Sequence, residues 1–429
     1  MREHLEIKEN HLYIGGVDCV KLADEFGTPL YVMDENRIRH RYREIYNAFS
    51  RLYPKVEIKY SYKANTSLAI LHILRQEGAG ADVVSEGELY IALNVGIEPE
   101  KIFFTGNNKT DRELRMALEA GVIINIDSLH ELERLKRICE SEQKKAKISF
   151  RVNPDISPET HPHLATGLKE SKFGIQMDEA IFAYKKAAKC KFFSIEGIHM
   201  HIGSQITSVS PYKEATYKLL DLVGKLHRNS IELNFIDLGG GIGIKYKEDA
   251  PSITPRELAE NIVPIVKNKI DEYGLGDPTL ILEPGRYIVG DAGILLTRVT
   301  TIKKGIKKFI GVDSGFNILI RPVMYQAYHE VVVANKMTAK KEETVDIAGN
   351  LCESGDIIAK NRFLPRIEEG DIIAILDTGA YGIVMSSRYN SRPLPAEVLV
   401  CNGKYELIRK REGLHDLLSK QIVPVRLLK

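Results

Sequence analysis

The sequence lacks the features that define several specialised classes of protein. Its five cysteines are scattered over 429 residues and form no Cys-X-X-Cys pair, which argues against a disulfide framework and against a zinc site. The 60 lysines and arginines nearly balance the 58 acidic residues, so no excess of charge attracts nucleic acid or anionic lipid. No apolar run approaches the roughly 20 residues that cross a bilayer, and the first residues do not resemble a signal peptide. We therefore expect a cytoplasmic protein with no metal, nucleic-acid or membrane partner.

The length and composition predict a globular protein of two domains. A chain of 429 residues exceeds the roughly 250–300 residues at which a single hydrophobic core usually stops growing. Hydrophobic residues make up 44% and charged residues 28% of the chain, which is typical of globular proteins and not of disordered ones.

Short apolar runs alternate with longer amphipathic segments from about residue 55 onward, which is the pattern of strands followed by helices. The eight runs are VEIKYSY from Val56, ADVVS from Ala81, IFFTG from Ile102, VIINID from Val122, KISFRVN from Lys147, SIEGIHMHI from Ser194, LNFIDLG from Leu233 and TLILEP from Thr279. Eight such units favour a (β/α)8 barrel of the TIM type over an open doubly wound sheet. We expect this α/β barrel to occupy residues 36–295.

The carboxy-terminal part of the chain has a different pattern of apolar and polar residues. Strand-like segments separated by turn residues follow one another there, with almost no long helical pattern between them. They are RVTTIKK, KFIGVDSG, HEVVVANK, ETVDIAG, DIIAILDTG and AEVLVCNG. The segments LEIKENHLYIGG and PLYVMD near the amino terminus also read as strands. We predict a mostly β domain formed by residues 1–35 and 296–429.

Catalytic groups of a (β/α)8 barrel lie at the carboxyl ends of its strands, so the residues that follow the predicted strands are the candidates for chemistry. They are Lys63, Ser85, Glu86, Asn107, Asp127, Asn153, His201, Gly239 to Gly241, Glu283 and Arg286. A partly desolvated lysine at such a position becomes an amine nucleophile for a carbonyl group, which is Schiff-base chemistry. Position alone favours the interpretation of Lys63 as an ordinary surface lysine.

Further candidates surround this lysine in the predicted barrel. Consecutive glycines in DLGGGIG let the backbone approach an anion and present N–H donors, although turns also use glycine. Arg286 in EPGR would add a bidentate ligand for phosphate or carboxylate. Glu283 is expected to face a cationic partner, because an unpaired buried charge is costly. His201 in HMHIGSQ is a candidate for proton transfer or ring stacking, and His199 competes with it for that role.

Seven motifs in order resemble a known family. YSYKANTS, GADVVSEGEL, SKFGI, HMHIGSQ, DLGGGIG, EPGR and CESGD are similar to the motifs of the pyridoxal-phosphate amino-acid decarboxylases of the alanine-racemase-like barrel class. The likeness extends from about residue 20 to residue 415, which is essentially the whole chain. It implies a decarboxylase with pyridoxal 5'-phosphate as its cofactor.

The resemblance also implies a role for each residue of the cofactor site. Lys63 would form the Schiff base with the cofactor, and His201 would stack on the pyridine ring. Glu283 would hydrogen-bond the pyridine nitrogen and keep it protonated, whereas a racemase of this fold is expected to place an arginine there. The remaining cofactor ligands that the resemblance implies are Ser204, Gly239, Gly240, Gly241, Gly285, Arg286 and Tyr381.

Catalysis and substrate choice depend, by the same resemblance, on the carboxy-terminal domain. Cys352 in LCESGD would donate a proton after loss of carbon dioxide, and it would come from the neighbouring subunit of a homodimer. Without the resemblance, Cys352 would read as a buried thiol. The substrate ligands that the resemblance implies are Arg286, Arg321, Tyr325, Glu353 and Tyr381.

The pairing of Arg321 with Glu353 suits a substrate whose far end carries both a carboxylate and an amine. The implied reaction is decarboxylation of meso-2,6-diaminopimelate to L-lysine, the last step of lysine biosynthesis. A related decarboxylase of ornithine, arginine or a carboxylated polyamine is the alternative, although polyamine-pathway relatives carry an aspartate at the position of Glu353. A homologue without catalytic activity is a third possibility, which the intact set of Lys63, His201, Glu283 and Cys352 disfavours.

Overall fold

The computed structural model describes residues 2–156 and 171–428, and the chain divides into two compact units. The barrel unit comprises Ile38–Lys245 and Asp249–Val289, and the β unit comprises Met1–Arg37, Tyr246–Glu248 and Gly290–Lys429. Residues 246–248 and 290–295 therefore lie with the β unit, although the sequence placed them in the barrel. Tyr246 explains part of this difference, because its ring lies 5.0 Å from the Arg321 guanidinium and 5.2 Å from the His329 ring.

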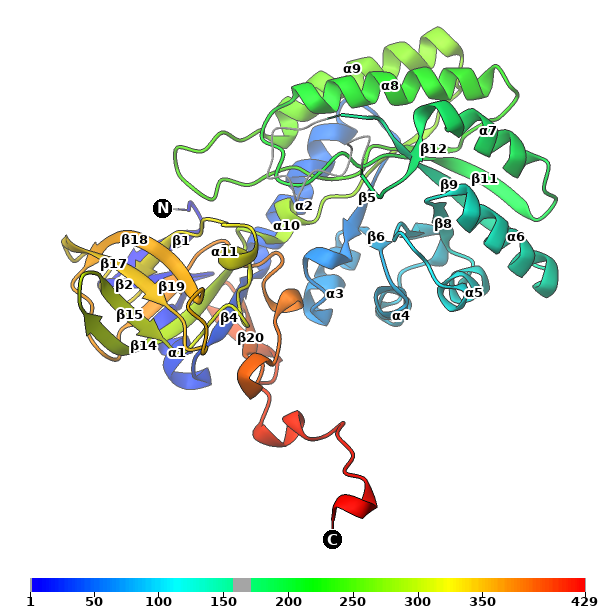
Figure 1. Ribbon diagram of the computed structural model, residues 1–429. Coiled ribbons are helices and arrows are strands. Elements are labelled where there is room, and N and C mark those ends of the chain that lie inside the picture. The colour runs from blue at the N-terminus through cyan, green and yellow to red at the C-terminus, as the bar shows by residue number, and fades with distance from the viewer. Residues whose placement is uncertain (1, 157–170, 429) are drawn as a thin grey trace. The chain divides into compact units, whose positions relative to one another are not determined.

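Eight parallel strands form the closed barrel that the alternating pattern predicts, which confirms the expected fold (Figure 1). They are β5 (Val56–Ser61), β6 (Gly80–Val83), β7 (Ile102–Phe104), β8 (Ile123–Ile126), β9 (Ala146–Asn153), β11 (Phe193–His199), β12 (Phe235–Asp237) and β13 (Thr279–Leu282). The ring closes where β13 pairs with β5, with Leu280 opposite Val56. A short strand, β10 (Ile175–Gln176), is added beside β9. All eight carboxyl ends therefore meet at one end of the barrel.

Helices follow the strands in sequence, at the positions that the amphipathic segments predict. They are α3 (Leu68–Gln76), α4 (Glu86–Val95), α5 (Asp111–Ala120), α6 (Leu129–Glu142), α7 (Met177–Ala188), α8 (Ser210–His227) and α9 (Pro255–Tyr273). Side chains cap the first turns of α4, α5, α6 and α9, and in α5 Thr110 and Glu113 form a capping box. None of the helices in the described residues is long and apolar enough to span a membrane.

The β unit contains a nine-stranded sheet into which the amino-terminal strand is inserted. Strand β4 (Leu30–Asp34) lies between β14 (Gly293–Lys304), to which it is antiparallel, and β20 (Ala396–Cys401), to which it is parallel. The other strands of the sheet are β15 (Lys308–Val312), β16 (Val331–Val333), β17 (Lys341–Ala348), β18 (Ile357–Pro365), β19 (Ile372–Ile375) and β21 (Lys404–Arg409). A separate sheet contains β1 (Leu5–Lys8), β2 (His11–Ile14) and β3 (Val17–Asp18). The expectation that amino-terminal strands join this domain is confirmed.

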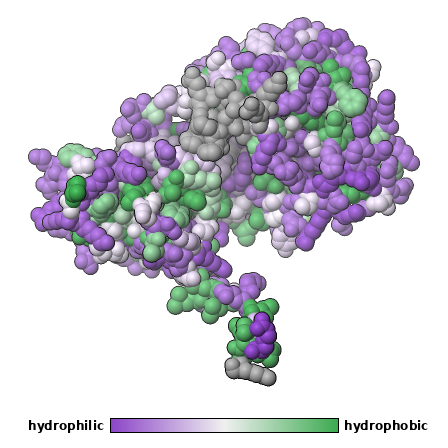
Figure 2. All heavy atoms as spheres, in the orientation of Figure 1, coloured by the Kyte–Doolittle hydropathy of each residue, from purple (hydrophilic) through white to green (hydrophobic). Residues whose placement is uncertain are grey.

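The chain ends in a segment that exposes apolar side chains. After β21, residues 414–428 form two short 3-10 turns, Leu414–Leu417 and Val425–Leu427. Seven of their large apolar side chains are between 56% and 91% exposed: Leu414, Leu418, Ile422, Val423, Val425, Leu427 and Leu428. Figure 2 shows this C-terminal tail as a run of mainly hydrophobic spheres. The tail contributes little to the core of its own chain.

Candidate active site

Lys63 lies at the carboxyl end of β5, where the sequence predicts chemistry. A 3-10 turn, Tyr62–Ala64, carries its side chain, which is 37% exposed, and its Nζ lies 3.0 Å from Asp82 Oδ2. Asp82 is a fully buried residue of β6 that also accepts hydrogen bonds from Ser61 Oγ at 2.7 Å and from Thr105 Oγ1. The carboxylate is therefore fixed from two sides, and it holds the Lys63 ammonium at the mouth of the barrel.

A second carboxyl group lies near this ion pair. Glu88, in the first turn of α4, accepts a hydrogen bond from the Val84 amide at 2.9 Å. Burial raises the pKa of Glu88 to about 7; the Val84 hydrogen bond opposes the rise, the charge of Asp82 adds to it, and Lys63 opposes it. The strand-end prediction missed both Asp82 and Glu88. A charged residue inside the apolar run ADVVS was the available signal for Asp82.

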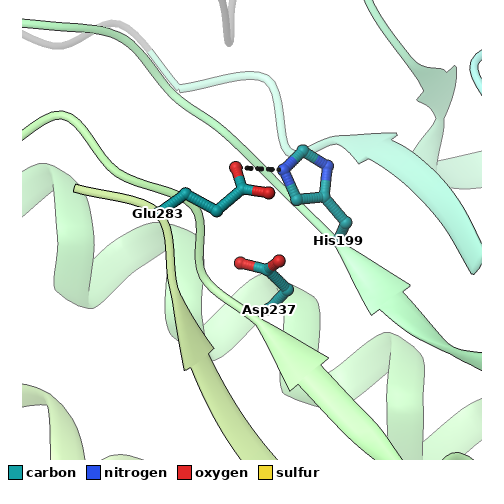
Figure 3. Close-up of side chains that lie close together, drawn as sticks. All are labelled: His199, Asp237 and Glu283. Carbon is teal, nitrogen blue, oxygen red and sulfur yellow. Dashed lines mark hydrogen bonds and ion pairs between the residues drawn. The ribbon is translucent and has the colours of Figure 1, made fainter. Parts of the chain in front are cut away.

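Glu283 follows β13 and is 3% exposed. Its Oε2 lies 2.9 Å from His199 Nε2, and Figure 3 shows the two side chains pointing toward each other from the ends of β11 and β13, between which β12 lies. The expected cationic partner is thus replaced by a histidine in direct contact. Burial opposes ionisation of Glu283, but the hydrogen-bonded contact with His199 and the positive charges of Lys63 and Arg151 outweigh burial and lower the pKa of Glu283, so the group is a carboxylate.

Asp237, at the end of β12, lies beneath Glu283 and is fully buried (Figure 3). Its Oδ1 accepts a hydrogen bond from the Gly239 amide at 2.8 Å. Burial, followed by the negative charge of Glu283, raises the pKa of Asp237 well above its usual range. The two neighbouring acids therefore differ in charge: Asp237 is protonated and Glu283 is ionised.

His201 and His199 occupy different environments. This difference distinguishes the two histidines, whose roles the sequence left open. His201 is partly buried, and its Nδ1 accepts a hydrogen bond from the Gly240 amide at 3.2 Å. Burial lowers the pKa of His201 well below its usual range, and the charges of Lys63 and Arg151 lower it further. Its ring is therefore neutral. His199 is 1% exposed and is engaged by Glu283.

The three glycines after β12 form a turn that has no room for side chains. A Cβ atom on Gly240 would lie 2.0 Å from the backbone oxygen of Glu283, and Gly239 and Gly241 adopt φ angles of +70° and +108°. Arg286 begins α10 (Arg286–Val289), and its Nη2 lies 3.0 Å from Ser204 Oγ. These residues, with Gly285 against the turn that carries Lys63, all belong to the barrel unit.

The remaining predicted residues lie in the β unit. Arg321, which is 4% exposed, begins α11 (Arg321–Met324), and Tyr325 follows that helix. The Cys352 amide donates a hydrogen bond to Asn390 Oδ1 at 3.0 Å, and Glu353 accepts one from the Tyr389 hydroxyl. Cys352 is exposed, which corrects the expectation of a buried thiol that its sequence context alone gives.

Tyr381 is in the segment that precedes the 3-10 turn Ile383–Met385, and its φ angle is +56°. Non-glycine residues are uncommon in this left-handed region, so the backbone here is strained. Within the β unit, Cys352 and Glu353 thus contact Tyr389 and Asn390 of a second segment. Arg321 belongs to α11, and Tyr325 follows that helix.

Comparison with known proteins places the chain in a family. The model of the pyridoxal-binding domain of pyridoxal-dependent decarboxylases matches residues 36–290. The chain belongs to the pyridoxal-dependent decarboxylases, a family of lyases whose cofactor is pyridoxal phosphate, as the ordered motifs predict.

Similar proteins in this family carry the name diaminopimelate decarboxylase. Diaminopimelate decarboxylase of Methanothermobacter thermautotrophicus is 51% identical over 422 residues, covering 98% of both chains. That of Archaeoglobus fulgidus is 45% identical and covers 97% of this chain and 98% of its own. The crystal structure of diaminopimelate decarboxylase from Methanocaldococcus jannaschii in complex with L-lysine superposes with a TM-score of 0.94 at 42% identity, covering 99% of both chains.

The barrel residues fit pyridoxal phosphate. The buried Glu283 carboxylate is bound to His199 through Oε2 and lies beside the protonated Asp237, and its Oε1 is an acceptor that can take a hydrogen bond from a ring nitrogen. The turn at Gly239 to Gly241 gives close access to backbone N–H groups, and Arg286 supplies a guanidinium for a phosphate. Lys63 supplies a partly exposed amine at the same end of the barrel.

Proposed function

We propose that the chain decarboxylates meso-2,6-diaminopimelate to L-lysine and carbon dioxide, the last step of lysine biosynthesis. The observation that carries this proposal is the convergence of Lys63, Glu283 and the turn at Gly239 to Gly241 at one barrel end, in a chain that matches diaminopimelate decarboxylases over almost its whole length. Membership of the family supports the class of reaction, and the similarity to diaminopimelate decarboxylases supports the substrate.

Each part of the barrel site has a role in this reaction. When bound, pyridoxal phosphate supplies an electron sink for the negative charge that departing carbon dioxide leaves behind. Lys63 would hold the cofactor through its amine, which Asp82 orients. The turn at Gly239 to Gly241, with Ser204, Gly285 and Arg286, would hold the phosphate. His201 would pack on the ring as a neutral imidazole, and the Glu283 carboxylate would hold a proton at the pyridine nitrogen.

The β unit supplies the groups for the substrate. Arg321 binds the distal carboxylate and Glu353 binds the distal ammonium, with Tyr325 and Tyr381 as further ligands. Cys352 delivers the proton that replaces the lost carboxylate. Its exposure supports this role, because a proton donor has to reach a substrate outside its own loop.

We propose further that the active enzyme is a homodimer in which Cys352 and Glu353 act at the partner subunit's barrel. The C-terminal tail supports an assembly, because seven large apolar side chains exposed within one short segment are unusual for a monomer. The root of the tail adjoins the loop of Cys352, since Glu412 forms an ion pair with Arg388, two residues before Asn390.

The test is an assay of the purified protein with pyridoxal phosphate against diaminopimelate, ornithine and arginine, measuring release of carbon dioxide. We expect release from diaminopimelate and a strong preference for it over the other two. Arg321→Lys keeps the charge but loses the planar two-pronged donor set, so it should raise KM for diaminopimelate. Preference for ornithine would refute the substrate assignment, and no release from any of the three would refute the decarboxylase.

A further inference from the structure

A chain of hydrogen-bonded, buried polar side chains leads from the interior of the barrel to Glu283. Ser149 on β9, Asn125 on β8 and His199 on β11 are each at most 1% exposed. Ser149 Oγ lies 2.9 Å from Asn125 Oδ1, Asn125 Nδ2 lies 2.9 Å from His199 Nδ1, and His199 Nε2 lies 2.9 Å from Glu283 Oε2. Burying polar groups of this kind costs free energy unless each of them makes its hydrogen bonds. The donor and the acceptor of each bond can therefore be deduced along the chain.

The direction of these hydrogen bonds fixes the protonation of His199. The Ser149 hydroxyl donates to Asn125 Oδ1, which turns the amide nitrogen of Asn125 toward the histidine. An amide nitrogen only donates, so Nδ1 of His199 has to accept and carries no proton. The single proton of a neutral ring is then on Nε2, where it is donated to Glu283.

The position of Asn125 in the barrel is itself well fixed. Asn125 stands directly opposite Ser149 in the register of β8 and β9, so the strand pairing sets the distance between the two side chains. The buried ammonium of Lys109 donates to the backbone oxygen of Asn125 at 2.7 Å. Strand pairing and this hydrogen bond together hold the amide in place.

We propose that Ser149, Asn125 and His199 are positioning residues that act through Glu283. They hold His199 as the neutral tautomer with its proton on Nε2, which ties down Oε2 and leaves Oε1 as the oxygen for the cofactor's pyridine nitrogen. A doubly protonated His199 would offset the charge of Glu283 and weaken its hold on the pyridine proton, whereas a neutral donor orients the carboxylate and leaves its charge intact. This inference rests on the proposed function for its consequence, but the tautomer itself does not.

The first test measures the tautomer in the protein without cofactor. In protein labelled with 15N-histidine, long-range 1H–15N NMR spectra should show His199 Nδ1 unprotonated and Nε2 protonated, with the signals assigned by their loss in His199→Gln. A doubly protonated ring, or a proton on Nδ1, would overturn the proposal. Because no reaction is involved, this result stands or falls separately from the decarboxylase assignment.

A second variant tests whether Asn125 sets the tautomer. Asn125→Asp replaces the donor with an acceptor of the same size, while Glu283 still accepts from Nε2, so the His199 signals should move to those of a ring protonated on both nitrogens. Ser149→Ala is the milder change should the aspartate variant fail to fold, and it should leave a mixture of ring states because the amide loses its fixed orientation. Unchanged His199 signals in a folded variant of either kind would overturn the role of the chain.

The third test follows the consequence for the cofactor. In holoenzyme reconstituted with cofactor labelled with 15N in the pyridine ring, the ring nitrogen should be protonated, and His199→Ala should reduce that protonation. The same variant should lower kcat by about 10- to 100-fold, as loss of a hydrogen bond to a buried charge does, with KM changed little. Restoring a donor in His199→Gln should recover part of both effects.

His227→Ala is the matched control, because His227 lies at the end of α8, far along the chain from Glu283, and its ring contacts Glu232. It should leave the pyridine signal and kcat as in the parent. If His199→Ala also leaves the pyridine nitrogen protonated and kcat unchanged, the positioning role is wrong even where carbon dioxide release from diaminopimelate is confirmed.

Discussion

The carboxyl groups around the barrel mouth show how neighbouring acids acquire different charges. Asp82 is tied to Lys63, Ser61 and Thr105, whereas Glu88 is buried beside it and holds its proton to about neutral pH. Asp237 and Glu283 are divided in the same way, one protonated and one ionised. A site that binds a positively charged amine thus avoids the repulsion of four negative charges.

Glu88 makes the stability of the fold depend on pH. Its carboxyl keeps a proton to about pH 7 in the folded state but loses it near the ordinary value of 4.5 when unfolded. The stabilisation from this group is therefore complete below the unfolded pKa and is lost as the pH rises through the folded pKa. Glu88→Gln is neutral at every pH, so the urea midpoint of the parent relative to this variant should fall between about pH 5 and pH 8.

The matched control for this measurement is Glu119→Gln, on the exposed face of α5. Its midpoint should follow that of the parent at both pH values. A parent and a Glu88→Gln variant whose midpoints move in parallel would show that Glu88 does not titrate in this range.

At the scale of residues, the sequence predicts the groups that stand just beyond strands and misses those that stand within them. Lys63, Glu283 and Arg286 follow strand ends, so strand periodicity was enough to select them. Asp82 and Asn125 lie inside strands β6 and β8, where a short apolar run does not show which side chains face the interior of the barrel. His199 could be suspected from its spacing to His201, but only its contact with Glu283 separates the two.

Among the elements, the turn after β12 has the least tolerance for change. Gly240→Ala would place a Cβ against the backbone oxygen of Glu283, and backbone cannot move aside as a side chain can. We expect a loss of stability of about 1–3 kcal/mol or more, with weaker cofactor binding, because the displaced strand end also carries Glu283. Thermal unfolding and titration with pyridoxal phosphate measure the two effects.

Gly87→Ala provides the comparison within the same unit. The nearest atom to its added Cβ would be Ser85 Oγ at 3.7 Å, an ordinary contact in the first turn of α4. This variant should be neutral or more stable by about 0.5–1 kcal/mol, since alanine is the better helix former. Equal effects of the two substitutions would contradict the argument from crowding at Gly240.

At the scale of elements, the eight strands of the barrel were predictable, but several other elements were not: helices α1 (Cys19–Phe26), α2 (Glu35–Ser50), α10 and α11 and strands β3, β10, β18 and β21. Helix α2 buries Ile38, Tyr42, Ile45 and Phe49 at helical spacing, yet its many charges obscure that stripe. Helix α1 is short. Strand β18 is interrupted by the polar residues KNR, and β21 exposes much of its surface at the edge of its sheet, so neither shows an apolar run.

The assembly of the whole molecule can be tested by mixing subunits. In a homodimer that shares its sites, a Lys63→Ala subunit supplies an intact Cys352 to a Cys352→Ala subunit, whose own Lys63 is intact. Random pairing then restores one site in about half of the dimers, so mixing the two inactive variants should recover about a quarter of the parent activity.

Subunit exchange has to be verified in the same experiment, with parent proteins that carry two different tags. If tagged subunits exchange but activity does not return, each site is built from one chain. If each variant before mixing is as active as the parent, neither Lys63 nor Cys352 is needed.

The insertion of β4 between β14 and β20 has a consequence for how the chain is made. Residues 30–34 leave the ribosome early, but their two partner strands begin at residues 293 and 396. The nine-stranded sheet therefore cannot be completed until nearly all of the polypeptide has been synthesised, whereas the barrel closes once β13 ends at residue 282. During translation β4 stays unpaired until its partner strands have been synthesised, so we expect chaperones to bind this apolar strand in the nascent chain.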